Sequence, residues 1–113
     1  MKVLVIEPLK DPYTAEIDGK LETMQKIVGG LIQMIIPFDD PEIALICNDE
    51  GKLMGLPPNR ALYDDKGNIV DIISGNFFLC SAPADSENFE GLSDEQIEKY
   101  TKRFEALEIY IKP

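Results

Sequence analysis

Short apolar segments separated by turn residues dominate the first part of the chain. Residues 2–6, KVLVI, form a nearly continuous apolar run, and Tyr13, Ala15 and Ile17 alternate with polar residues. Alternation with a period of two is typical of a half-buried strand, and the intervening LKDP has the composition of a turn. The pattern predicts an N-terminal β-hairpin.

A helical spacing of apolar residues follows this hairpin. Leu21, Met24 and Val28 lie on one face of a predicted helix, Asp18 is suitably placed to cap its start, and a glycine pair ends it. The segments LIQMIIPF and EIALICN come next, joined by the turn DDP, and we expect them to form a second hairpin.

The middle of the chain is less regular. KLMGLPPNRAL predicts an irregular or short helical crossing, and DDKGN is a turn that precedes the apolar IVDIISGNFFLC. After this segment the composition changes to small and acidic residues in SAPADSENFEG, which is typical of an exposed connector.

A second helix is predicted from residue 93 onward. Ser93 and Gln96 have the spacing of a capping box. The apolar residues that follow form one stripe that we expect to dock on a sheet, either in the same chain or in a second copy: Ile97, Tyr100, Phe104 and Leu107. The tail EIYIKP could add a short edge strand.

These elements together predict an α+β fold: a mainly antiparallel sheet of five or six short strands with two helices on one face. At 113 residues the chain is expected to be a single domain. We divide it into a core over residues 1–82, an exposed connector over 83–92, and a C-terminal helix and tail over 93–113 that docks on the core.

Charge narrows the possible functions. The chain has 21 acidic and 11 basic residues, a formal net charge of −10, and no histidine. A phosphate backbone requires clustered Lys and Arg, so direct binding of nucleic acid is not expected. Histidine is the most common general base and zinc ligand near neutral pH, so its absence excludes most acid–base catalytic sites and most transition-metal sites. We therefore expect no catalytic residues, metal or cofactor. The N-terminal apolar run is too short for a signal peptide or membrane span, which predicts a cytoplasmic protein without membrane contact.

Two cysteines and one glycine pair are candidates for chemistry. Cys47 and Cys80 each end an apolar run, and we interpret both as buried thiols; a disulfide or a nucleophilic role for Cys80 is less favoured. The Gly29-Gly30 pair could cradle phosphate, but it follows a helix instead of opening one, so a helix stop is favoured.

NDEGK and DDKGNIVD resemble calcium loops in composition only, since neither has glycine at the required sixth position.

The segment GLPPNRAL contains the strongest binding candidate. Pro57 and Pro58 hold the backbone extended, which is expected to display Asn59 and Arg60 to a carboxylate, a phosphate or a partner backbone. An alternative, which is favoured, is structural. Arg60 would then pair with one of three neighbouring acids, and Asn59 would cap a short turn: the acids are Glu50, Asp64 and Asp65.

The motifs VGG, NDEGKL, LPPNRAL and SGNFFLC occur in an order and spacing that resemble the family known as domain of unknown function number 3846. The resemblance covers residues 1 to 82 and extends loosely into LSDEQIEKYTKRF. It implies an origin in phages, plasmids or mobile elements of bacteria, and it transfers no catalytic residue.

That implied origin favours a small, non-enzymatic acidic accessory protein that binds a host or element-encoded protein with a basic surface. In this hypothesis it is a counter-defence inhibitor of restriction enzymes or CRISPR nucleases that mimics nucleic acid, with carboxylates in place of phosphates. The candidate contact residues are Asp39, Asp40, Glu42, Asp49, Glu50, Asp64 and Asp65. The charge could instead serve solubility alone. A second hypothesis is a module that binds a small molecule or nucleotide through the loop of residues 57–60. Monomer and homodimer both remain open.

Overall fold

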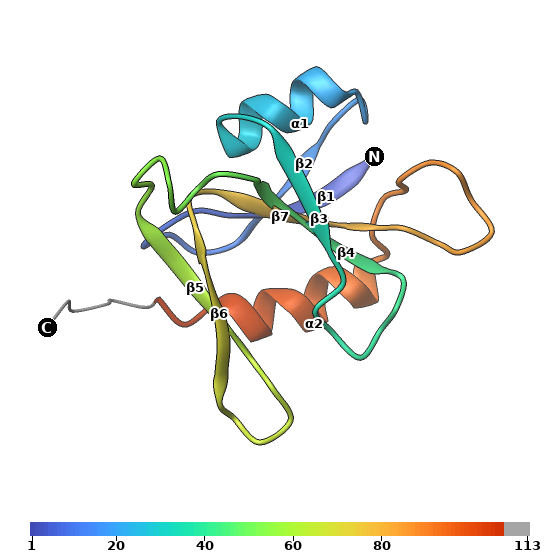
Figure 1. Ribbon diagram of the computed structural model, residues 1–113. Helices are drawn as coiled ribbons and strands as arrows, with labels where there is room; N and C mark the ends of the chain where they lie inside the picture. Colours follow the sequence, from blue (N-terminus) through green and yellow to red (C-terminus); the bar gives the residue numbers. More distant parts are fainter. Residues whose placement is uncertain (108–113) are drawn as a thin grey trace, which may run out of the picture.

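The computed structural model describes residues 1–107 and has an α+β fold (Figure 1). It contains seven strands and two helices over that range, in place of the five or six strands predicted. The elements are β1 (Lys2–Ile6), β2 (Tyr13–Glu16), α1 (Leu21–Val28), β3 (Ile32–Ile35), β4 (Ile43–Asn48), β5 (Pro58–Tyr63), β6 (Ile69–Ser74), β7 (Phe77–Ser81) and α2 (Asp94–Phe104).

Five strands form the main sheet, in the order β2-β1-β7-β4-β3. All four neighbouring pairs are antiparallel. Both predicted hairpins are confirmed, since β1 pairs with β2 and β3 pairs with β4. The sheet is therefore mainly antiparallel, as the pattern of apolar residues predicts.

A second sheet consists of β5 and β6 alone. The prediction of an irregular or helical crossing over residues 52–62 holds for 52–57, which form turns and irregular structure, and is wrong from Pro58 onward, where a strand begins. Proline is tolerated at the first position of a strand, where its missing N–H breaks no interior ladder bond. Ala61 and Leu62 are buried within β5, so the hairpin contributes to the core.

The two helices cover opposite faces of the main sheet, and the prediction that both lie on one face is wrong (Figure 1). Alternate residues of β1 point to the two sides: Val3 and Val5 pack in a cluster with α1, whereas Leu4 and Ile6 pack in a cluster with α2. The central strands β1, β4 and β7 are continuous apolar runs, so both of their faces are buried. Each face of the sheet therefore needs a helix to cover it.

The helix ends follow the sequence in part. The capping box of Ser93 and Gln96 is present in α2, and Gly29, with φ 80°, ends α1 as predicted. Asp18 is not the N-cap of α1, which is Lys20; its carboxylate instead accepts a hydrogen bond of 2.9 Å from the Lys20 N–H.

The apolar stripe of α2 is shorter than predicted. Tyr100 and Phe104 are buried and Ile97 packs against the same cluster, but Leu107 lies beyond the end of the helix and is exposed. The predicted edge strand in the tail lies outside the described residues. Among residues 1–107, no helix has the length and apolar character needed to cross a membrane.

Candidate functional site

Asn59 and Arg60 are not displayed to solvent, so the prediction that they are accessible is wrong. The exposed fractions of Asn59 and Arg60 are 0% and 1%. Both residues follow Pro58 in β5: Arg60 pairs with Ile73 of β6, and Asn59 lies at the irregularity between Pro58 and Arg60. A ligand could reach them only if the strand moved.

The guanidinium of Arg60 connects three parts of the chain. Its Nε donates to the carbonyl oxygen of Phe104 at 3.0 Å, at the end of α2. One terminal nitrogen donates to the carbonyl of Lys10 at 2.8 Å, in the loop between β1 and β2. The other donates to the Oδ1 of Asn59 at 2.9 Å and to the Asn59 carbonyl at 3.3 Å. Arg60 therefore binds the β5–β6 hairpin to the main sheet and to the C-terminal end of α2.

The side chain of Asn59 makes a second junction. Its Nδ2 donates to the carbonyls of Ile6 and Gly75, both at 2.9 Å. Its Oδ1 accepts a hydrogen bond from Arg60, so both the NH2 group and the oxygen of the Asn59 amide have partners. Asn59 thus fixes the end of β1 against the bend before β7, and it does not cap a turn as predicted.

The acids suggested as partners of Arg60 take no part in these bonds. Within residues 1–107, Arg60 forms no ion pair with Glu50, Asp64 or Asp65. The burial of Arg60 supports a structural role. Its described acceptors, however, are mainly backbone carbonyls and not the carboxylates of neighbouring loops.

The first part of the 57–60 loop borders a hollow of about 330 Å³. Pro57 and Leu56 line it together with Lys26 and Asn76, whereas Asn59 and Arg60 do not. The arginine that motivated a site for an anionic ligand is therefore absent from this hollow.

Three of the predicted acids come together at a larger hollow of about 430 Å³. It lies where the β3–β4 loop, the tip of the β5–β6 hairpin and α2 meet. We call it the acidic hollow; it is lined by Pro37, Phe38, Asp39, Tyr63, Asp64, Asp65, Val70 and Arg103. Its two acidic loops are about 25 residues apart in the sequence, so no local sequence pattern could predict that they meet.

The acidic hollow combines charge with apolar surface. Its three carboxylates and one guanidinium give a formal charge of −3 + 1 = −2. The Arg103 guanidinium lies over the Phe38 ring, 4.9 Å from its centroid. Phe38 is packed against Tyr100, so the apolar wall is held by α2. These neighbours of the acids were not identified from the sequence.

Two of the predicted acids also stabilise their own turns. The Oδ1 of Asp64 accepts hydrogen bonds from the N–H groups of Lys66 and Asn68 at 2.9 and 2.8 Å, and the pKa of Asp64 is lowered mainly by the backbone N–H of Asn68. The Oδ1 of Asp40 accepts from the N–H of Glu42 at 3.0 Å. Asp39 and Asp65 have no such role in the described contacts.

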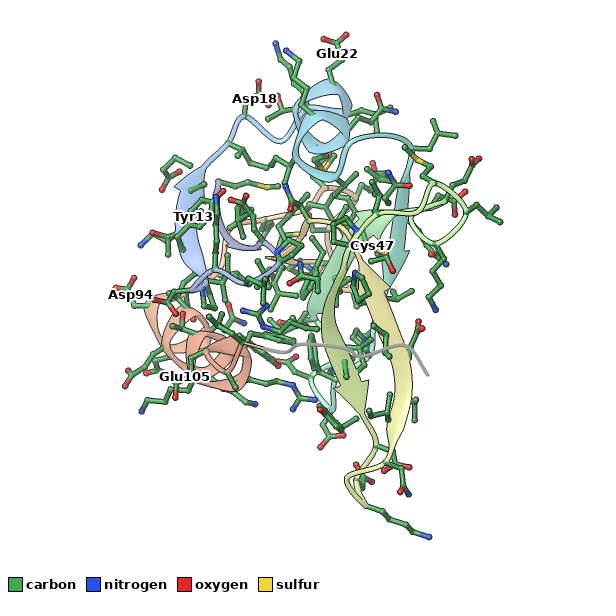
Figure 2. The ribbon with its side chains drawn as sticks, turned by 90° about the vertical axis from the view of Figure 1, so that its left-hand side faces the viewer. Tyr13, Asp18, Glu22, Cys47, Asp94 and Glu105 are labelled. Atoms are coloured by element: carbon green, nitrogen blue, oxygen red, sulfur yellow. The ribbon has the colours of Figure 1, made fainter. Side chains whose placement is uncertain are left out.

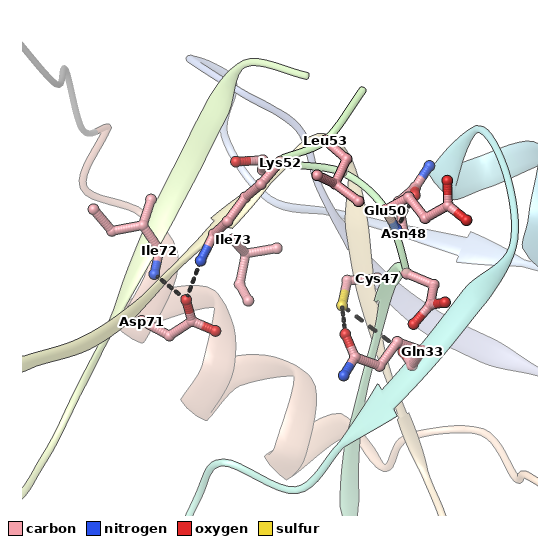
Figure 3. Close-up of a pocket in the computed structure, with 12 residues that line it drawn as sticks. Gln33, Cys47, Asn48, Glu50, Lys52, Leu53, Asp71, Ile72 and Ile73 are labelled. Carbon is pink, nitrogen blue, oxygen red and sulfur yellow. Dashed lines mark hydrogen bonds and ion pairs between the residues drawn. The ribbon is translucent and has the colours of Figure 1, made fainter. Parts of the chain in front are cut away.

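Asp49 and Glu50 lie at the other end of β4, beside a smaller hollow of about 140 Å³ (Figure 3). There Lys52 pairs with Asp71 at 2.6 Å, across the gap between the loop and β6. The structure therefore separates the seven predicted acids into two groups, at opposite ends of β4.

None of the seven predicted acids forms an ion pair within residues 1–107. They are Asp39, Asp40, Glu42, Asp49, Glu50, Asp64 and Asp65. Other acids also lie on the outside of the molecule, as Figure 2 shows for Asp18, Glu22 and Asp94, whereas Cys47 lies in the interior. Within residues 1–107, the negative charge at the predicted loops is thus not tied up in ion pairs, although Arg103 lines the acidic hollow.

The two thiols are buried and free. Burial raises the pKa of Cys47 to about 11 and that of Cys80 to about 12, so neither is a thiolate near neutral pH. They belong to clusters on opposite faces of the main sheet, so a disulfide between them would require a different fold.

Comparison with known proteins gives one assignment at the level of family. The model of the family described as Domain of unknown function (DUF3846) matches residues 1–105, which include both sheets and both helices. No curated protein and no solved structure matches the chain.

Proposed function

The chain belongs to the family described as Domain of unknown function (DUF3846), and from this premise we propose that it is a non-enzymatic protein that docks through its acidic loops on a basic surface of another protein. We place it among the accessory proteins of phages or mobile elements, acting in the cytoplasm. Its partner would be a host or element-encoded protein that handles nucleic acid, such as a restriction or CRISPR nuclease. Docking would block the basic groove in which that partner binds the phosphates of nucleic acid.

The observation that carries the proposal is the acidic hollow. Asp39 and Asp65 come from different loops to one concave site, and their carboxylates have no ion-pair partner within residues 1–107. The three acids of the hollow outnumber its one arginine, and the resulting negative potential would steer a basic partner. Solubility alone would not require that acids converge on a concave site.

The apolar wall of the hollow adds a means of recognition. A Lys or Arg side chain of the partner has an apolar stem and a charged head. The stem would pack against Tyr63 and Val70, while the head would reach the carboxylates of Asp39 and Asp65. Anchoring a long side chain in a pocket is typical of the residues that dominate binding energy at interfaces.

The residues available for catalysis support a binding function. The sequence has no histidine, and both thiols have raised pKa values. A cysteine nucleophile reacts as the thiolate, and a raised pKa disfavours that form near neutral pH.

Binding to a lysine- and arginine-rich peptide of defined sequence, followed by fluorescence anisotropy, tests the proposal. We expect the affinity to fall steeply as salt rises, because exposed charges are screened over about 8 Å at physiological ionic strength. The double variant Asp39→Asn/Asp65→Asn should bind about tenfold more weakly, since it removes the two acids that do not hold their own turns.

The matched control is Asp49→Asn/Glu50→Gln, which removes the same charge at the opposite end of β4. If both double variants weaken binding equally, net charge and not the acidic hollow is responsible. Binding that does not change with salt would argue against the whole proposal.

A further inference from the structure

The two edges of the main sheet differ in how they are protected against pairing with another strand. The edge strand β2 carries Glu16 and is flanked by Asp11, Pro12 and Asp18. Charges and proline are the usual means by which proteins protect an edge. The other edge strand, β3, lies within residues 29–38, GGLIQMIIPF, which contain no charged residue. The one proline of this segment, Pro37, lies two positions beyond the end of β3.

The outer side of β3 presents backbone groups suited to pairing. Leu31 accepts a hydrogen bond from Asp49 at 2.8 Å, which extends the ladder between β3 and β4. Because residues of an antiparallel strand alternate between the two sides, Gln33 and Ile35 face β4, and Ile32 and Met34 direct their N–H and C=O groups outward. Within residues 1–107, no strand pairs with this outer side.

Exposed apolar side chains accompany this edge. Leu31, Met34 and Ile36 are 59%, 48% and 41% exposed. Leu53 and Met54, on the loop after β4, are also exposed, and the Met54 sulfur lies 3.6 Å from the side chain of Asn48, the register partner of Ile32. The uncharged edge is therefore bordered by apolar surface, in a protein whose loops are strongly acidic.

We propose that β3 is a self-association site, at which the β3 strands of two copies pair antiparallel about a two-fold axis at Gln33. In this register Ile32 of one copy lies opposite Met34 of the other, so all four outward backbone groups of these two residues in each copy form hydrogen bonds. The two main sheets then become one continuous sheet, and the contact is isologous, as in most closed dimers.

The self-complementary register favours a second copy as the occupant of this edge, and the charge distribution permits it. Each chain has a formal charge of −10, so two copies repel each other wherever acidic loops face. Pairing along an uncharged strand avoids that contact. The antiparallel arrangement also places the two Asp39–Asp40 segments, which follow β3 in the chain, at opposite ends of the paired strands. A basic partner protein gains no electrostatic attraction at this neutral edge.

Sedimentation velocity of the full chain, from micromolar to near-millimolar concentration, tests the proposal. We expect a reversible monomer–dimer equilibrium in the original protein. Met34→Lys should raise the dimer dissociation constant by about tenfold or more, since an edge lysine opposes strand pairing. Thr14→Lys adds the same charge at an exposed, outward-facing position of β2 and should leave the constant unchanged. A protein that stays monomeric throughout, or equal effects of the two lysines, would overturn the proposal.

Cross-linking tests the register directly. In a Cys47→Ala background, Gln33→Cys places two thiols across the two-fold axis, in a pair of residues whose Cα atoms would lie about 4.5 Å apart. Mild oxidation should give a covalent dimer, and Thr14→Cys in the same background should not. A covalent dimer from Thr14→Cys but not from Gln33→Cys would refute β3 pairing. Circular dichroism confirms that each variant is folded, and neither experiment depends on the docking function proposed above.

Discussion

At the scale of single residues, burial decides the role of Arg60. A buried guanidinium loses its hydration, and this loss must be offset by acceptors inside the protein. The carbonyls of Phe104, Lys10 and Asn59 provide them. Removal of the side chain would leave these oxygens inside the protein without their donors, which is more costly than the loss of an exposed charge.

We therefore expect Arg60→Ala to lower the free energy of unfolding by about 3 kcal/mol or more. Arg60→Lys should recover only part of this loss, because a single ammonium cannot reach acceptors that lie in three directions. Urea denaturation measures the change. Arg103→Ala, an exposed arginine on α2, is the control and should cost less than about 1 kcal/mol. If the two alanine variants unfold at the same urea concentration, Arg60 does not hold the elements together.

At the scale of elements, Gly75 allows the chain to pass from one sheet to the other. It follows β6 of the two-stranded sheet and precedes β7 of the main sheet. Its φ is +83°, in the left-handed region, and a Cβ placed there would lie 2.7 Å from the Cδ1 of Leu56. Both the backbone conformation and the close approach therefore favour glycine.

Gly75→Ala should lower the free energy of unfolding by about 2 kcal/mol, from the strain of a left-handed alanine and the displacement of Leu56. Gly67→Ala is the matched control, because Gly67 has a similar φ of +81° with no atom within 4 Å of the added Cβ. That variant should cost about 1 kcal/mol from backbone strain alone. Thermal or urea unfolding compares the two, and an equal loss would show that the contact with Leu56 is unimportant.

Most elements could be predicted from the sequence because their signals are local. The spacing of apolar residues predicted α1 and α2, and Ser93 marked the start of α2. The strand β5 was missed because Pro57 and Pro58 suggested a break. The partners of Arg60 could not be predicted, because the acceptors Lys10 and Phe104 lie 50 and 44 residues away in sequence. The acidic residues were identified from composition, but their convergence depends on the tertiary fold.

At the scale of the whole molecule, two separate apolar layers protect the thiols. Cys47 belongs to the apolar cluster on the α2 face of the main sheet and Cys80 to the cluster on the α1 face. Burial raises both pKa values above the ordinary thiol value of 9.0, to about 11 and about 12. The folded state thus retains protons that the unfolded chain releases in alkaline solution.

The stabilisation from these thiols is fully present below pH 9 and is lost as the pH rises through 11 to 12. We expect the free energy of unfolding to decrease between pH 9 and pH 11, with a slope of up to about 1.4 kcal/mol per pH unit for each thiol. Urea unfolding at a series of pH values measures this slope. Cys80→Ala should unfold with a smaller dependence on pH, and an unchanged slope would assign the alkaline effect to other groups.

The burial of β1, β4 and β7 on both faces has a consequence for how the chain finds its correct alignment. In a strand with one wet face, a shift of one residue exposes apolar side chains and is strongly disfavoured. In β1 the same shift exchanges one apolar layer for the other, so hydrophobicity alone does not reject it. Specific bonds must do so, and the Asn59 amide, which donates to the carbonyl of Ile6, is one of them. The polar junction at Asn59 and Arg60 thus favours the native alignment of β1 over alignments that hydrophobicity alone would accept.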